Sequence, residues 1–264
     1  MNRLLVVLLL FAAPAGADET RVDEIVEANT RFALWRVISA PLAHENQVMG
    51  YQENRDVLTV FAANRVMDGD NATDIERMLD VAQLWLVAEE IGKAPPLHRG
   101  AGMDGEAARR VFCRIAIEGP GRVHDLIARW GLPAEQPDTC EEDQSILAEE
   151  TDALFEAALL QDEPLRAGRV ADGYVRIING FPDHLDIAVS DQKSRQWLGF
   201  LRRTEVIESV ADQLASEFSI GDLMILADRC GVATVRWDPD QREMTLCLEL
   251  LDSYARLAHI MVAD

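Results

Sequence analysis

The residues best suited to catalysis are His44 and Glu45, which open the stretch HENQV. Zinc peptidases carry the pattern HExxH on a helix, where two histidines one turn apart bind the metal and the glutamate activates a water molecule. Val48 occupies the position of the second histidine, and its side chain has no lone pair for a metal. His44 is therefore the candidate metal ligand and Glu45 the candidate catalytic residue, whereas a surface or helix-capping pair is the plainer interpretation.

The other polar residues do not form a second catalytic motif. His98, His124, His184 and His259 are too scattered for joint metal binding through local spacing. No serine stands in a GxSxG nucleophile elbow. Acidic runs such as residues 141–143 are typical of a solvated helix face, and they would form an acid–base pair only if folding brought two of them together.

The C-terminal stretch CGVATVRWDPDQREMTLCLEL predicts a β-hairpin. Two runs with apolar residues at every second position flank the turn signal DPDQ, in which proline fixes φ and aspartate bonds its own backbone. Pairing outward from this turn places Cys247 opposite Val232, two residues from Cys230. A disulfide between the two cysteines then requires the chain to bend at Gly231.

The sequence holds four cysteines, Cys113, Cys140, Cys230 and Cys247, which allow three pairings. The hairpin favours Cys230–Cys247, and this leaves Cys113–Cys140. A zinc cluster is the alternative, but the sequence has no CxxC pair. Two disulfides are therefore the preferred interpretation.

These residues must be positioned by a helix-rich chain. Apolar spacing predicts helical segments over residues 22–38, 57–67, 74–91, 104–117, 123–130, 142–160, 193–218 (one helix or two) and 248–262. Short strands are predicted at 174–178, 185–189 and 223–226, in addition to the hairpin. The expected fold class is α+β, mostly α-helical, with a small antiparallel sheet concentrated after Gly173. A linker at 164–172 separates a helical half, 18–163, from a sheet and hairpin half, 173–264.

The first 17 residues have the pattern of a secretory signal peptide. Arg3 gives a positive start, residues 4–13 are apolar, and Ala15-Gly16-Ala17 is a small-residue cleavage site. The apolar run is shorter than the roughly 20 residues that a membrane-spanning helix needs, so no stable membrane insertion is expected. We expect a periplasmic or secreted protein, in a compartment where disulfides persist.

The chain is strongly acidic, with 46 Asp and Glu against 25 Lys and Arg and a formal net charge of −21. Such a surface repels nucleic acid and anionic lipid, which bind clustered lysine and arginine. The plainest role for the charge is solubility, and no nucleic-acid partner is expected.

The hairpin resembles the motif CGxxNAxYDPxxxxxxLCYEL of a bacterial family of exported zinc-metallopeptidase-like proteins of unknown function. The matching positions are Cys230-Gly231, Asp238-Pro239, Leu246-Cys247 and Glu249-Leu250. Two further blocks match less tightly, and they contain Cys113 and Cys140, which supports the same two disulfides. The resemblance implies a zincin-like fold.

The order of the blocks differs from the family, in which the hairpin precedes the HExxH helix. Here the hairpin comes last, so the chain resembles a circular permutation rejoined through 164–172, with one domain over 18–264. Permutation is tolerated when the two termini lie close together. The hypothesis requires the hairpin to pack beside the helix of residues 32–48.

The resemblance aligns His44 and Glu45 with the metal helix, but Val48 replaces the second histidine. Of the family's downstream acidic segment, Glu53 remains, and Asp56 is out of register. Catalytic zinc usually has three protein ligands, so no cofactor is expected here. The resulting hypothesis is an inactive pseudo-enzyme that binds a peptide or protein.

Two alternatives remain open at this stage. The first is an active metallohydrolase whose zinc is held by His44, by Glu53 or Asp56, and by a distant histidine such as His98 or His124. The second is an envelope structural protein with no ligand. Whether the chain is an enzyme is therefore undecided by its sequence.

Overall fold

The computed structural model describes residues 15–45, 55–67, 72–90, 151, 155, 175–178, 191–218 and 222–263. Its elements are α1 (Ala15–Glu45), α2 (Arg55–Val66), α3 (Ala72–Glu90), β1 (Val175–Ile178), α8 (Gln192–Thr204), α9 (Val206–Glu217), β2 (Leu223–Asp228), β3 (Val235–Asp238), β4 (Glu243–Cys247) and α10 (Leu248–Ala263). The fold is mostly helical with a small sheet near the C-terminus, as predicted. The zincin-like character stays a prediction.

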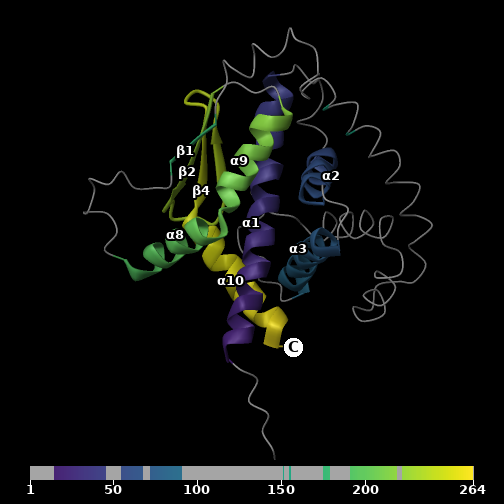
Figure 1. The fold of residues 1–264 in the computed structure, drawn as a ribbon, viewed down its shortest axis with the longest axis vertical. Coiled ribbons are helices and arrows are strands. Elements are labelled where there is room, and N and C mark those ends of the chain that lie inside the picture. The colour runs from purple at the N-terminus through teal and green to yellow at the C-terminus, as the bar shows by residue number, and fades with distance from the viewer. Residues whose placement is uncertain are drawn as a thin grey trace, which may run out of the picture.

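Helix α1 is the centre of the molecule (Figure 1). It contacts α2, α3, α9, α10 and β3. Its consecutive residues 32–35 are all at most 1% exposed. Because successive residues of a helix point about 100° apart, burial of four in a row means that neighbours surround this part of α1. The helix also continues through Pro41 rather than ending there.

An aromatic cluster joins α1 to its neighbours. The Trp35 ring lies 6.1 Å from Phe61 of α2 and 6.0 Å from Phe218, which directly follows α9. Phe61 also stacks on Phe155 at 3.9 Å. Aromatic rings bury large apolar areas, so this cluster is a main source of hydrophobic stabilisation for the helical part.

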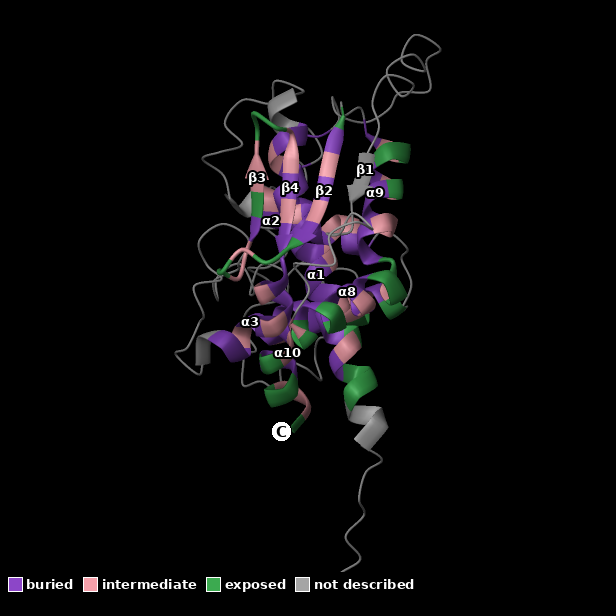
Figure 2. Ribbon diagram, turned by 90° about the vertical axis from the view of Figure 1, so that its left-hand side faces the viewer, coloured by how far each residue is buried: buried purple, intermediate pink, exposed green. Residues whose placement is uncertain are grey.

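The four-stranded sheet is mixed, with the strand order β1-β2-β4-β3. Only the hairpin β3–β4 is antiparallel, and both β1–β2 and β2–β4 are parallel. The expectation of a purely antiparallel sheet is therefore wrong. Parallel strands need a crossover connection, and α8 and α9 provide it between β1 and β2. Local sequence patterns do not reveal which strands pair across such a connection. Figure 2 shows β2 and β4 with alternating buried and half-buried residues.

The hairpin is confirmed, but its register differs from the predicted one. Trp237 pairs with Met244 rather than Arg242, and the backbone N–H of Cys247 donates to the carbonyl of Thr234 at 3.0 Å. The Asp238 carboxylate accepts from the backbone N–H groups of the second and third residues after it, at 3.0 and 3.2 Å. This Asx-type turn moves the loop one residue along the chain, and Arg242 closes it with φ of 52°.

Residues 193–218 form two helices, α8 and α9, which meet at Glu205. Glu205 adopts the left-handed conformation with φ of 51°. Glycine is the usual residue in this conformation, so the sequence carries no clear signal for the break. The predicted segments 104–117, 123–130, 142–160 and 185–189 lie outside the described residues, apart from positions 151 and 155.

Candidate functional site

The predicted catalytic pair lies at the C-terminal end of α1. His44 and Glu45 are its last two residues, and the following residues 46–48, over which an HExxH helix would continue, lie outside the described part of the chain. The side chains of both residues lie outside the described part, as does Val48.

The other candidate ligands are also mostly outside the described residues. Glu53, His98 and His124 lie there, and Asp56 is described only as a backbone position in the first turn of α2. In the described ranges, the structure holds no group of three or more His, Cys, Asp or Glu residues that could bind a metal ion. The same ranges contain no helix long and apolar enough to cross a membrane.

One of the two predicted disulfides is confirmed. Cys230 and Cys247 are bonded, with 5.4 Å between their Cα atoms. The required bend is present at Gly231, whose φ is 73°, a conformation that favours glycine. Cys113 and Cys140 lie outside the described residues, so their pairing stays a prediction.

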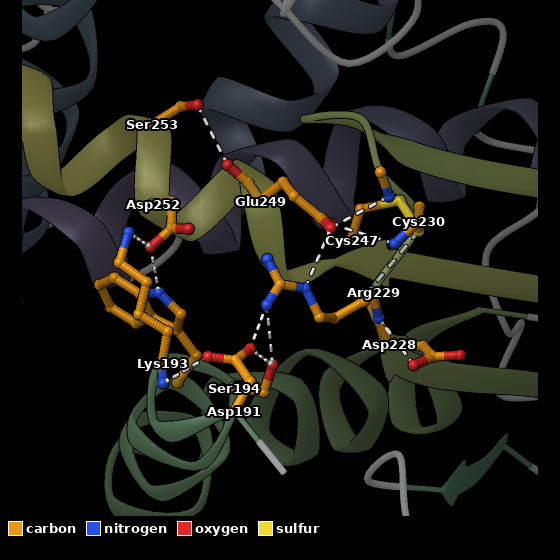
Figure 3. A network of polar contacts seen from close by, with 12 residues as sticks. Asp191, Lys193, Ser194, Asp228, Arg229, Cys230, Cys247, Glu249, Asp252 and Ser253 are labelled. Carbon is orange, nitrogen blue, oxygen red and sulfur yellow. Dashed lines mark hydrogen bonds and ion pairs between the residues drawn. A yellow bond between two sulfur atoms is a disulfide. The ribbon is translucent and has the colours of Figure 1, made fainter. Parts of the chain in front are cut away.

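The polar residues around this disulfide gather at one edge of the sheet (Figure 3). β2 and β4 are parallel, with Asp228 paired to Cys247, so the chain leaves both strands at the same edge. Arg229 follows β2 there, and Glu249 follows β4 in the first turn of α10. The carboxyl edge of parallel strands is where α/β proteins commonly place functional residues. This edge is therefore the candidate site that the described residues offer.

Glu249 is the central acceptor of this edge. Its carboxylate accepts from the backbone N–H groups of Cys230 and Gly231, both at 3.0 Å, and from Nε of Arg229 at 3.3 Å. Burial acts to raise the pKa of Glu249, but the backbone and Arg229 hydrogen bonds outweigh it, so the pKa is lowered. Glu249 is therefore a carboxylate at neutral pH.

Arg229 extends these contacts to α8. Its Nη1 contacts the carboxylate of Asp191, which is the N-cap of α8 and accepts from the backbone N–H of Lys193 at 3.0 Å. The hydroxyl of Ser194 donates to Asp191 at 2.6 Å. This hydrogen bond, the Lys193 amide and Arg229 lower the pKa of Asp191. We call Asp191, Arg229, Cys230, Gly231 and Glu249 the Glu249 network.

A second contact fastens α8 to α10. The indole Nε1 of Trp197 donates to Oδ1 of Asp252 at 2.7 Å, and Nζ of Lys193 lies 3.2 Å from the same oxygen. Together with the Glu249 network, these contacts join β2, α8 and α10 at the carboxyl edge of the sheet (Figure 3).

The contacts of this edge suit a structural role better than general acid catalysis at neutral pH. A general acid at neutral pH needs a carboxyl pKa raised toward 7, whereas the pKa values of Glu249 and Asp191 are lowered. Arg229, held between two carboxylates, has its pKa raised, so it does not act as a base. The Glu249 network therefore orients the disulfide turn and two helix starts.

Sequence reasoning missed this network. Arg229 and Asp191 carry no motif, and 38 positions of sequence separate them. Glu249 is one of the positions that resemble the hairpin motif, but that resemblance implies no role for its side chain. An acidic residue in the first turn of a helix directly after a half-cystine was the available signal.

A further buried charge joins α1 to α3. The carboxylate of Asp80, whose side chain is 4% exposed, contacts Nη2 of Arg21. Nη1 of the same arginine lies 3.2 Å from the carboxylate of Glu24. Burial raises the pKa of Asp80 to about 6, although the Arg21 charge acts in the opposite direction. Burial lowers the pKa of Arg21, but its two carboxylate partners outweigh this and raise it overall. Burial thus outweighs the ion pair in setting the pKa of Asp80 but not in setting that of Arg21, because Asp80 is buried whereas Arg21 is half exposed.

The fold and the edge together define an α+β protein with a mixed sheet and a disulfide-stapled C-terminal hairpin. No family model matches the chain, and no curated protein or solved structure matches it.

Proposed function

We propose that the chain is an exported pseudo-peptidase, which binds a peptide or protein without hydrolysing it. The observation that carries the proposal is Val48, which stands where an HExxH helix needs its second histidine. Loss of this ligand leaves His44 with no helical partner for a metal. The chain would then use the cleft of the resembled family only to bind a peptide or protein.

Two features support the proposal. The Cys230–Cys247 disulfide is compatible with an exported protein, because disulfides persist in oxidising compartments. The leader pattern of residues 1–17 is typical of a chain bound for the periplasm or for secretion.

The experiment is to measure the zinc content of the oxidised mature chain after zinc loading and dialysis, with His44→Ala as the matched variant. We expect neither protein to retain zinc, because three protein ligands are usually needed. Both proteins should also leave a casein substrate intact.

Near-stoichiometric zinc that is lost in His44→Ala would contradict the proposal and favour an active metallohydrolase with other ligands. Zinc retained equally by both proteins would place the metal away from His44. The second result would leave the catalytic question to the casein assay alone.

A further inference from the structure

The two cysteines of the C-terminal disulfide differ in how far solvent reaches them. Cys247 is 0% exposed. Cys230 is half-buried, and the other four residues of the stretch 228–232 are all exposed. A Cβ atom built on Gly231 meets nothing within 4 Å, so the space beside Cys230 is open. An external thiol therefore approaches the bond from the Cys230 side rather than from the Cys247 side.

The backbone of both cysteines is held in place by hydrogen bonds that do not involve sulfur. Glu249 accepts from the backbone N–H groups of Cys230 and Gly231, both at 3.0 Å (Figure 3). Cys247 belongs to β4, which pairs with β2, and its own backbone N–H donates to Thr234 at 3.0 Å. These contacts keep the two Cα atoms, 5.4 Å apart in the disulfide, close together when the S–S bond is open.

The buried cysteine lies at the start of a helix. Cys247 directly precedes Leu248, the first residue of α10. Burial disfavours a thiolate there, whereas the positive end of a helix dipole favours one. The negative charge of Glu249 opposes the dipole, but Nε of Arg229 lies 3.3 Å from that carboxylate and offsets it. The helix start therefore compensates for part of the burial penalty on a Cys247 thiolate.

We propose that Cys230 and Cys247 form a reversible thiol–disulfide site, which opens and closes within the folded protein by exchange with a dithiol. One thiolate of the dithiol attacks Sγ of Cys230, forms a mixed disulfide and expels Cys247 as a thiolate. The second thiolate of the dithiol then attacks its own sulfur in the mixed disulfide and expels Cys230. The dithiol leaves as an internal disulfide, and the two cysteines take up two electrons and two protons in total.

Closure is the reverse exchange with a disulfide such as oxidised glutathione. Glu249 is the positioning residue of the site, because it holds the Cys230 backbone beside Cys247 while the bond is open. The inference goes beyond the proposed peptide binding, since it depends on neither His44 nor zinc.

The first test titrates the mature protein with dithiothreitol, alkylates the free thiols and digests the chain with trypsin. Arg236 and Arg242 lie between the two cysteines, so mass spectrometry reads each cysteine on its own peptide. The bond should open while the tryptophan emission maximum stays that of the oxidised protein, and oxidised glutathione should close it again. A shift of the emission maximum in step with opening of this pair would overturn the proposal, because the bond would then be a staple without which the chain unfolds.

The second test asks which sulfur exchanges. Each of the single variants Cys247→Ala and Cys230→Ala keeps one thiol of the pair. With oxidised glutathione, the Cys230 thiol should form a mixed disulfide at least about tenfold faster than the Cys247 thiol, because access limits such exchange. Equal rates, or a faster reaction at Cys247, would overturn the assignment of Cys230 as the exchanging sulfur.

The third test measures the equilibrium between the open and closed pair in glutathione buffers, under conditions where the protein is folded. Glu249→Gln should lower the equilibrium constant for closure about tenfold, because a neutral amide holds the Cys230 turn less firmly. The matched control Glu19→Gln, at an exposed position of α1, should leave it unchanged. An unchanged constant in Glu249→Gln would mean that this residue stabilises both forms equally, and it would exclude the positioning role.

Discussion

Glu249 accepts hydrogen bonds from two successive backbone amides and from a guanidinium, so a single side chain fixes the turn that holds the disulfide. The backbone of Gly231 is in the left-handed region, and it offers its amide to the carboxylate in that conformation. At the residue scale, Cys230, Gly231 and Glu249 therefore have a structural role that does not depend on catalysis.

Replacing Glu249 with glutamine should lower the free energy of unfolding by about 1–3 kcal/mol, because a neutral amide bonds Arg229 poorly and accepts the two backbone amides less strongly. Urea unfolding at pH 7 measures the change. Because the pKa of Glu249 is lowered in the folded state, its stabilisation is present at neutral pH and is lost as the pH falls through that pKa.

Glu19→Gln is the control for this substitution, since Glu19 lies exposed near the start of α1. Its free energy of unfolding should match that of the unmodified protein. Equal stabilities of the two variants at pH 7 would contradict a structural role for the Glu249 network.

Asp80 should give the protein a pH dependence of the opposite sign. Its pKa is about 6 when folded and near 3.8 when unfolded, so the folded state binds more protons between these values. The contribution of Asp80 to the free energy of unfolding is therefore most favourable below about pH 4. It declines as the pH rises through 6, by as much as about 3 kcal/mol. The difference in unfolding free energy between the unmodified protein and Asp80→Asn, measured from pH 4 to pH 8, should follow this decline. A difference independent of pH would refute the assignment.

At the element scale, the disulfide should stabilise the hairpin by restricting the unfolded chain. Its sequence separation is 17, for which loop-closure entropy gives about 3 kcal/mol. Guanidinium unfolding of Cys230→Ala/Cys247→Ala measures this loss. Unlike a reducing agent, the substitutions leave Cys113 and Cys140 untouched.

The single variant Cys230→Ala is the control for this loss, because it removes the same bond but keeps the buried Cys247 side chain. The two variants should lose similar stability. A much smaller loss in the single variant would attribute the effect to packing of Cys247 rather than to the crosslink.

The elements that the sequence predicts are those with local signals. Apolar spacing predicted the core of α1, and the DPDQ turn predicted the hairpin. The break at Glu205 was not predicted because a glutamate in the left-handed conformation has no distinctive pattern. The parallel pairing of β2 with β1 and β4 depends on tertiary packing, and for the same reason the contact between Arg229 and Asp191 could not be predicted.

At the scale of the whole molecule, the net charge of −21 should make the fold sensitive to salt. Charge repulsion within the compact state opposes folding, and the Debye length falls from about 30 Å at 0.01 M to about 8 Å at 0.15 M salt. Screening should raise the thermal unfolding midpoint by about 2–4 °C over this range. Differential scanning calorimetry in sodium chloride measures the shift, with sucrose of equal osmolarity as the control. A fall would mean that ion pairs such as Arg21–Asp80 outweigh the repulsion.

The central position of α1 has a consequence for the order of events during synthesis. The ribosome makes α1 well before α9, β3 and α10, yet α1 packs directly against all three. Its fully buried segment around Trp35 has no complete set of neighbours until these later elements have emerged. Contacts between segments so distant in the chain also form slowly. A nascent chain therefore stays open at least until α10 has left the ribosome, and α1 needs protection from aggregation over that whole interval.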